Sequence, residues 1–358
     1  MPACTEAAQS RLSRGVTEGD TVSQMTRFAA IIGTGSYLPE TTLTNADLER
    51  MVETSDEWIV SRTGIHERRL ASVEHATSDL AFQAAARAIE CAGVSGDEID
   101  LLIVGTSTPD HLFPSTACIT QFKLGLTCPA FDVNAACSGF IYALHTGTAA
   151  IESGRATTVL VVGADALTRH VDFTDRATCV LFGDGAGAVV LRAAEEPGVL
   201  SVVLGADGTG RDLLTVPAGG SAAPCTVERV QNREHFVQMN GSEVYKFAVR
   251  MIPKATLQAL EQSGHSVEDL AWLIPHQANK RILDTIEERL GIDDERVYSN
   301  VERTGNTSAA SIPLAIDDLY TSGRLQPGDL IALVGFGAGL TWGSATIRWT
   351  MSAPDQEA

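Results

Sequence analysis

The chain has 358 residues, with 26 Lys and Arg against 45 Asp and Glu, and its formal net charge is −19 at pH 7. Apolar residues make up 44% of the chain and charged residues 20%, a composition that excludes a disordered chain, a collagen and a coiled coil. The acidic balance also argues against nucleic acid or an anionic membrane surface as the main partner, because a protein surface that binds many phosphates must carry a positive potential.

Residues 1–25 are expected to form a disordered extension, since they contain no apolar stretch of signal-peptide length. The apolar runs in the rest of the chain are too short to cross a bilayer, and residues 351–358 are expected to be a tail. The seven cysteines include no CxxC pair and no His and Cys at zinc spacing, which predicts a reduced cytosolic chain without structural metal.

Short β-rich runs alternate with amphipathic stretches along the chain, which predicts buried central strands joined by crossover helices. The expected strands are Phe28–Ile32, Leu101–Val104, Val159–Val162, Val189–Leu191, Val202–Leu204, Trp272–Ile274 and Leu330–Val334.

A weak internal repeat relates the two halves of the chain. Predicted helices end at Gly93 and at Gly264, 171 positions apart, and each is followed by an acidic turn and an apolar strand. The repeat predicts an α/β protein with two similar halves, residues 26–195 and 196–350, although apolar positions of two unrelated α/β segments can also align in this way. Ligands of open α/β sheets gather beyond the carboxyl ends of strands, so catalytic side chains are expected there.

Cys137 follows a predicted strand end and begins a predicted helix whose apolar positions, from Phe140 to Ile151, face inward. A helix N-terminus lowers the pKa of a thiol and favours the nucleophilic thiolate. The alternative for any free cysteine is a small buried hydrophobe, and we assign that role to the other six.

His276 stands at the end of a strand of the second half, with Asn279 and Arg281 shortly after it, and Asn306 lies in a Gly-containing turn before a helix. Each of these residues alone is more typical of a core residue, a cap or a turn. A cysteine, a histidine and an asparagine at strand-to-helix elbows of a duplicated sheet together indicate thioester chemistry. The Gly-rich runs at 183–187 and 335–339 lack the spacing of nucleotide loops and indicate close backbone packing.

At this point the sequence closely resembles the β-ketoacyl-acyl carrier protein synthase III family over residues 28–350. These are the initiating condensing enzymes of bacterial fatty-acid synthesis, and they have the thiolase fold, with layered helices and sheets. The motifs that carry the resemblance are Ile32–Pro39, Thr54–Ile65, Phe182–Gly187, Gly335–Gly343 and the segments around Cys137, His276 and Asn306.

The resemblance implies a role for each matching residue. Cys137, His276 and Asn306 form a catalytic triad, and the backbone N–H groups of Cys137 and Ala338 form an oxyanion hole, Ala338 replacing the glycine of the family. Phe336 crowds the departing carboxylate. The remaining assignments are Trp58, Arg62, Arg176 and Asn279 for coenzyme A, Phe113 for the partner subunit's acyl pocket, and Lys246, Arg250 and Arg281 for carrier-protein docking.

Three of these assignments have plainer alternatives in the sequence. Without the resemblance, the sequence around Trp58 indicates an ordinary residue of an amphipathic helix. Phe113 alone would be expected to pack in the core. Lys246, Arg250 and Lys254 recur every four residues, which puts them on one helix face, but such a face is often only solvated and Pro253 is expected to kink it.

The reaction implied by the resemblance is a decarboxylative condensation of acetyl-CoA, or another short acyl-CoA, with malonyl-acyl carrier protein. It is expected to take place in a cytoplasmic homodimer and to require no metal or redox cofactor. A thiolase would need a second cysteine near the C-terminus, yet none follows Cys225, and the elongating condensing enzymes have histidine where Asn306 stands. Relatives that make quinolones, olefins or polyketide starter units share the triad and remain the alternative, whereas an inactive partner subunit would lack Cys137.

Overall fold

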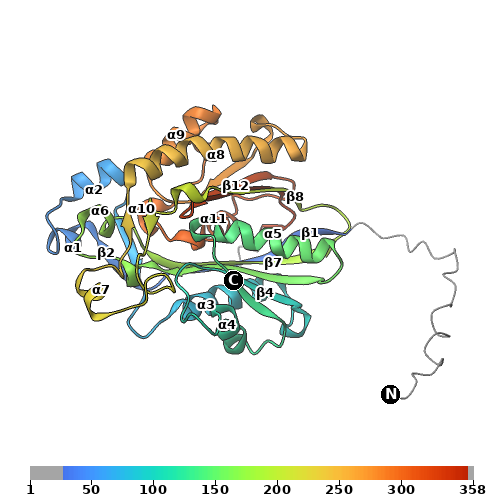
Figure 1. Ribbon diagram of the computed structural model, residues 1–358. Helices are drawn as coiled ribbons and strands as arrows, with labels where there is room; N and C mark the ends of the chain where they lie inside the picture. Colours follow the sequence, from blue (N-terminus) through green and yellow to red (C-terminus); the bar gives the residue numbers. More distant parts are fainter. Residues whose placement is uncertain (1–26, 354–358) are drawn as a thin grey trace, which may run out of the picture.

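The structure, a computed structural model, describes residues 27–353 (Figure 1). The expected extension, residues 1–25, lies outside the described residues, as do residues 354–358 of the expected tail. Within residues 27–353, no helix is both long enough and apolar enough to cross a membrane.

The first sheet is built from residues of the first half of the chain. Its strands are, in spatial order, β1 (Phe28–Tyr37), β7 (Asp184–Ala194), β6 (Thr158–Ala166), β4 (Leu101–Gly105) and β5 (Ala130–Val133). The β6, β4 and β5 strands run parallel to one another, and β7 is antiparallel to both β1 and β6. The β5 strand is therefore an open edge of this sheet.

The second sheet repeats this arrangement with residues of the second half. Its strands are, in spatial order, β11 (Trp272–Pro275), β12 (Leu330–Gly337), β13 (Thr341–Arg348) and β8 (Val199–Ala206). The β11 and β12 strands are parallel, and β13 is antiparallel to both of its neighbours. Their order and directions match those of β4, β6, β7 and β1, and all seven predicted strands lie inside observed ones.

Helices form a layer between the two sheets and a layer on each outer side (Figure 1). The helices α5 (Gly139–Glu152) and α11 (Ser311–Thr321) contribute to one core that also contains residues of both sheets. The helix α3 (Thr77–Ala92) packs on the outer face of the first sheet, and α8 (Gly241–Ser263) on that of the second. The structure is thus mixed α/β with five alternating layers.

Sequence signals explain where these helices begin and end. Gly93 and Gly264 end α3 and α8 in the left-handed conformation that glycine adopts most readily, as the repeat predicted. The predicted apolar stripe of α5 is buried from Phe140 to Ile151. Pro253 lies inside α8 without dividing the helix.

Shorter elements complete the fold. They are β2 (Thr41–Thr44), α1 (Asn45–Glu49), α2 (Asp56–Thr63), β3 (Glu67–Leu70), α4 (Thr116–Leu124), α6 (Arg176–Cys179), β9 (Leu214–Thr215), α7 (Val227–Gln231), β10 (Gln238–Met239), α9 (Lys280–Leu290) and α10 (Val301–Thr304).

The expectation that the six other cysteines are buried is only partly correct. Cys128 and Cys179 are buried, but Cys91, Cys118 and Cys225 are exposed. Cys91 and Cys118 lie on helices and Cys225 lies in a loop. Cys4 lies outside the described residues.

Candidate active site

Cys137 lies in a short 3-10 turn, Ala136–Ser138, which joins the end of β5 to the start of α5. The chain reverses there with Ala136 in the left-handed region, at a φ of 47°. The cysteine is 7% exposed, so the elbow leaves only a small part of it accessible from a cavity.

Burial raises the pKa of the Cys137 thiol to about 12; the hydroxyl of Ser308 opposes this rise, and the charge of Asp165 adds to it. This result corrects the expectation that the helix start lowers the pKa of this thiol. Desolvation of a fully enclosed sulfur outweighs the partial charge of the helix end. The resting group is a neutral thiol at pH 7, and it must lose its proton as it reacts.

His276 directly follows β11, and its backbone N–H donates to the carbonyl of Val334 over 2.7 Å. The side chain is buried and meets the ring of Phe336 edge-on, with 5.6 Å between the ring centroids. Burial lowers the pKa of His276 to about 3, so the imidazole is neutral. Its Nδ1 atom is buried without a hydrogen-bond partner among the described residues.

Asn306 lies in the turn between α10 and the 3-10 turn Ser308–Ala310. Its backbone N–H donates to Leu181 over 2.8 Å, and its carbonyl accepts from Gly183 over 3.0 Å. The side-chain Oδ1 accepts the backbone N–H of Ser308 over 2.9 Å. Because Oδ1 is occupied, the amide NH₂ group is the end of Asn306 that is left to donate to a ligand.

The structure brings these side chains to one cavity of about 570 Å³. Its walls include Cys137, His276, Asn306 and Phe336, which come from four separate segments of the chain. We call it the entrance cavity, because exposed residues of α8 and α9 also line it. A thiol, an imidazole and a carboxamide therefore face a common space.

The second Gly-rich turn presses directly against the nucleophile elbow. A Cβ atom on Gly337 would lie 2.6 Å from the backbone nitrogen of Cys137, so only glycine permits this approach. Ala338, the next residue, lines a second cavity together with Cys137. The two backbone N–H groups expected to form the oxyanion hole thus belong to segments in contact.

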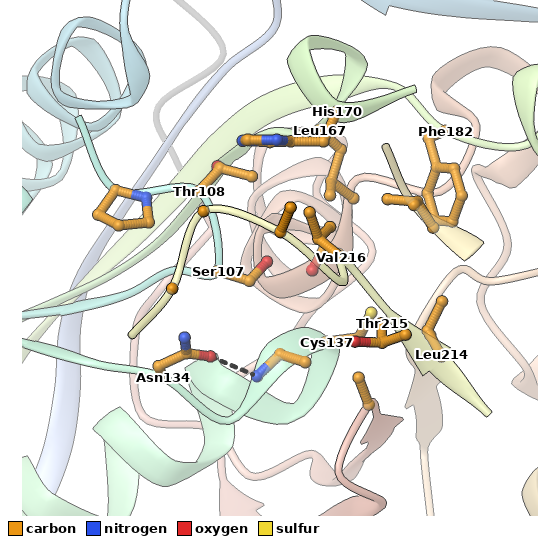
Figure 2. A pocket seen from close by; sticks show the side chains of 18 of the residues that line it. Ser107, Thr108, Asn134, Cys137, Leu167, His170, Phe182, Leu214, Thr215 and Val216 are labelled. Atoms are coloured by element: carbon orange, nitrogen blue, oxygen red, sulfur yellow. Dashed lines mark hydrogen bonds between the residues drawn. The ribbon is translucent and has the colours of Figure 1, made fainter. Parts of the chain in front are cut away.

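This second cavity, also about 570 Å³, shares Cys137, Phe182 and Leu214 with the entrance cavity, and we call it the acyl cavity (Figure 2). Apolar side chains of several elements surround it, among them Leu167, Phe182 and Leu214. Ser107, Thr108 and His170 add polar groups to its wall. The cavity can hold a short apolar chain attached to the cysteine.

The residues expected to bind coenzyme A meet at the outer end of the entrance cavity. The Arg176 guanidinium lies 4.8 Å from the centroid of the Trp58 ring, and that of Arg62 lies 5.9 Å from it. Asn279 donates to the carbonyl of Arg62 over 3.2 Å, and both residues line the cavity. Two guanidinium groups and an indole are suited to stack on an adenine and to attract phosphate.

Phe113 does not pack in the core, so that alternative is wrong. The side chain is 85% exposed, and the neighbouring Leu112 is 81% exposed. Leu112 lines the acyl cavity of its own chain, whereas Phe113 does not.

The basic residues expected at the docking surface are exposed on one face of α8. Lys246, Arg250 and Lys254 lie on this face, and Lys246 pairs with Glu243 over 2.7 Å. Lys246 and Arg281 line the mouth of the entrance cavity, while Arg250 and Lys254 lie farther along the helix. The structure therefore brings only the first and last of these four residues to the cavity.

Sequence reasoning missed two residues next to the triad, Asp165 and Ser308. Asp165 is fully buried and accepts hydrogen bonds from Ser107, from Thr108 and, over 3.0 Å, from the backbone of Ala309. Its signal in the sequence is a carboxylate inside an otherwise apolar strand. Ser308 lines the acyl cavity and carries no such signal.

Within residues 27–353, no group of three or more His, Cys, Asp or Glu side chains is placed to hold a metal ion.

Comparisons with known proteins agree on one family. One family model, described as 3-oxoacyl-[acyl-carrier-protein (ACP)] synthase III, matches residues 131–208. A second model, described as the C terminal of the same synthase, matches residues 260–349. The beta-ketoacyl-[acyl-carrier-protein] synthase III of Xanthomonas axonopodis pv. citri is 53% identical over 323 residues, which cover 90% of this chain and 98% of that protein.

Solved structures extend this similarity to the fold. The 3-oxoacyl-[acyl-carrier-protein] synthase III of Aquifex aeolicus superposes with a TM-score of 0.83 at 45% identity, over 90% of this chain and all of that one. A priming beta-ketosynthase of a polyketide biosynthetic pathway superposes with a TM-score of 0.86 at 37% identity, over 92% of this chain and 98% of that one.

Proposed function

The chain belongs to the 3-oxoacyl-[acyl-carrier-protein] synthase III family and has its thiolase fold, and on that premise we propose that it initiates type II fatty-acid synthesis. As an acyltransferase it condenses acetyl-CoA, or another short acyl-CoA, with malonyl-acyl carrier protein to give a 3-oxoacyl-acyl carrier protein. The observation that carries the proposal is the meeting of Cys137, His276 and Asn306 in one cavity.

In the first half-reaction, acetyl-CoA enters the entrance cavity with its adenine against Trp58 and Arg176. The Cys137 sulfur attacks the thioester carbonyl, and the backbone N–H groups of Cys137 and Ala338 stabilise the negative oxygen of the tetrahedral intermediate. Coenzyme A leaves and takes up one proton as the Cys137 thiol loses one, so the step is balanced in protons. The acetyl group then extends into the acyl cavity.

In the second half-reaction, malonyl-acyl carrier protein replaces coenzyme A. The neutral imidazole of His276 and the amide NH₂ of Asn306 donate to the thioester oxygen of the malonyl group, so loss of carbon dioxide gives an enolate with a stabilised charge. Phe336 presents an apolar ring where the carboxylate is lost. Removal of one such donor costs roughly 3–4 kcal/mol of transition-state stabilisation, so two neutral donors have a large effect.

The enolate carbon then attacks the acetyl carbonyl and expels the Cys137 sulfur, which regains a proton from solvent. Electron pairs move only among carbon, oxygen and sulfur in this sequence. The mechanism therefore requires no metal or redox cofactor.

We also propose that the chain works as a homodimer joined along β5. This strand is an open edge, and large apolar side chains surround it: Leu112, Phe113, Phe122 and Phe131 are all exposed. Pairing of β5 with its copy would cover these groups and satisfy the edge. Phe113 would then reach the acyl cavity of the partner subunit and limit the length of the primer.

A cytoplasmic location fits this chemistry, because the reactive sulfur must stay reduced. The polyketide-priming relative supports an alternative role in making a starter unit for a secondary metabolite. The beta-ketoacyl-[acyl-carrier-protein] synthase III of Xanthomonas axonopodis pv. citri is the more similar of the two, at 53% against 37% identity, and this difference favours the role in fatty-acid synthesis.

The experiment that tests the proposal measures acetyl transfer from labelled acetyl-CoA and decarboxylation of malonyl-acyl carrier protein separately. We expect Cys137→Ala to abolish acetyl transfer, because it keeps the backbone donor but lacks the sulfur. His276→Ala and Asn306→Ala are expected to lose decarboxylation more severely than transfer, since their donors act on the enolate.

The matched control is Cys179→Ala, which removes another buried cysteine and is expected to keep both half-reactions. Label found on Cys118 or Cys179 would contradict the assignment of the nucleophile. Equal loss of both half-reactions in Asn306→Ala would contradict the role of Asn306.

A further inference from the structure

The hydroxyl of Ser308 is a buried polar group without a protein partner. Ser308 is 1% exposed, and its Oγ atom makes no hydrogen bond with any described residue. Buried hydroxyls in folded proteins are nearly always paired, so an unpaired one in a cavity wall indicates a group kept for a ligand or a reaction step. Ser308 lines the acyl cavity beside Cys137.

The backbone holds Ser308 in an unfavourable conformation. Its φ is 52°, in the left-handed region that a side chain disfavours. Three neighbours fix this geometry: the Ser308 N–H donates to Asn306 Oδ1, the next N–H donates to Asp165, and a Cβ on Gly163 would collide with the carbonyl of Ala309. A strained residue held from several sides is typical of functional sites.

The hydroxyl acts on Cys137. It lowers the pKa of the thiol, against the larger effect of burial. In the resting site Ser308 Oγ has no hydrogen-bond partner of normal geometry among the described residues, so its O–H is left to donate to the neighbouring sulfur. A thiolate, in contrast, is a strong acceptor, and hydrogen bonds to charged groups are about twice as strong as those between neutral groups.

We propose that Ser308 is a further catalytic residue, whose hydroxyl donates a hydrogen bond to the Cys137 sulfur as it ionises. This inference rests on the proposed function, because it names the group that makes a buried nucleophile usable. Ser308 keeps its own proton throughout. The proton of the thiol goes to the sulfur of coenzyme A during acetyl transfer and to solvent during alkylation.

The proposal also explains why one turn carries two functional groups. The backbone N–H of Ser308 orients the amide of Asn306, while its side chain serves Cys137. The same left-handed residue therefore connects the donor for decarboxylation with the nucleophile for transfer.

The test is the rate at which iodoacetamide labels Cys137 in the full chain, followed on the Cys137 peptide by mass spectrometry between pH 7.5 and 9.5. Alkylation needs the thiolate but neither substrate. We expect Ser308→Ala to label about tenfold more slowly than the natural chain at every pH, the effect of losing one hydrogen bond to a charged group. The slope of the logarithmic rate against pH should stay the same.

Ser311→Ala is the matched control, because Ser311 is equally buried in the same segment but its hydroxyl pairs with Thr307 over 3.1 Å. Its labelling rate is expected to be unchanged. Ser308→Gly removes the hydroxyl and also relieves the backbone conformation, so it should be slowed as much as Ser308→Ala. Thermal unfolding of each variant shows that it is folded.

Labelling of a folded Ser308→Ala or Ser308→Gly variant at or above the natural rate would overturn the proposal. Slowing in Ser308→Ala alone would also overturn it, because the cause would then be the strained backbone. If the natural chain transfers no acetyl group but the two variants still label slowly, the proposed function fails and the role of Ser308 stands.

Discussion

Cys137 and His276 are both held in their neutral forms by the same cause, burial. Burial raises the pKa of the thiol to about 12 and lowers that of the imidazole to about 3. A resting thiolate–imidazolium pair is therefore excluded, and in the mechanism that we propose His276 acts as a neutral hydrogen-bond donor. Such a donor stabilises an enolate without first having to lose or gain a proton.

The burial of His276 has a consequence for stability. Its pKa is about 3 in the folded chain and about 6.5 in an unfolded one, so only the unfolded state takes up this proton between these values. We expect folding stability to fall with pH below about 6.5 by up to about 1.4 kcal/mol per pH unit from this residue alone.

The measurement is the free energy of unfolding by urea at pH 8, 6 and 5, for the natural chain and for His276→Asn. The variant loses packing at every pH, and that loss is read at pH 8, where histidine is neutral in both states. At pH 5 the difference between the two proteins should shrink. A difference independent of pH would contradict the neutral, buried histidine.

At the scale of elements, the site forms where several turns meet, and these turns come into close contact only because small residues lie between them. The end of β12 touches the Cys137 elbow through Gly337, and β6 touches the 3-10 turn after Asn306 through Gly163. The distance between nucleophile and donors therefore depends on backbone packing as much as on the triad itself.

We predict that Gly337→Ala displaces the backbone N–H of Cys137, because its Cβ would lie 2.6 Å from that nitrogen. The loss of one well-placed oxyanion donor should slow acetyl transfer about 100-fold. The assay is single-turnover transfer from labelled acetyl-CoA, with unfolding temperature measured in parallel.

Gly208→Ala serves as the control, since a Cβ there meets no atom within 4 Å. It should transfer acetyl groups at the natural rate. If a folded Gly337→Ala kept transfer within about twofold, the backbone of Cys137 would not be an oxyanion donor of the assumed kind.

The sequence predicted what local patterns encode. Apolar runs located the strands, Gly93 and Gly264 ended the helices, and the same patterns placed Cys137 and His276 after strands. The strand-to-helix elbow expected at Asn306 was wrong, because Asn306 lies between α10 and a 3-10 turn. Two other features depend on contacts between distant segments. The raised pKa of Cys137 and the conformation of Ser308 arise only when both halves have folded together, since Ser308 of the second half lies next to Cys137 and Asp165 of the first.

At the scale of the whole molecule, the two sheets provide one working surface. The matching order and directions of their strands support our proposal that residues 26–195 and 196–350 are halves related by duplication. The first half supplies Cys137, and the second supplies His276 and Asn306. Neither half alone contains a complete site.

A net charge of −19 poses a problem for binding an acidic carrier protein, because two negative surfaces repel over about 8 Å at physiological salt. The α8 face with Lys246, Arg250 and Lys254, together with Arg281 at the start of α9, is a basic surface next to the entrance cavity. Glu243 neutralises part of it by pairing with Lys246. Lys246 and Arg281, which line the mouth, are the best placed to attract a carrier protein.

We therefore predict that Lys246→Glu combined with Arg281→Glu raises the KM for malonyl-acyl carrier protein by roughly tenfold more than the KM for acetyl-CoA. In our proposal coenzyme A binding depends mainly on Trp58, Arg62 and Arg176, whereas docking of a large acidic protein depends on the electric field at the mouth of the cavity. Steady-state kinetics between 25 and 300 mM salt should also show a weaker salt dependence in the variant.

The control is Arg27→Glu combined with Arg155→Glu, which changes the net charge equally at exposed residues that line neither cavity. Equal effects of the two double variants would mean that total charge, and not this surface, governs the encounter.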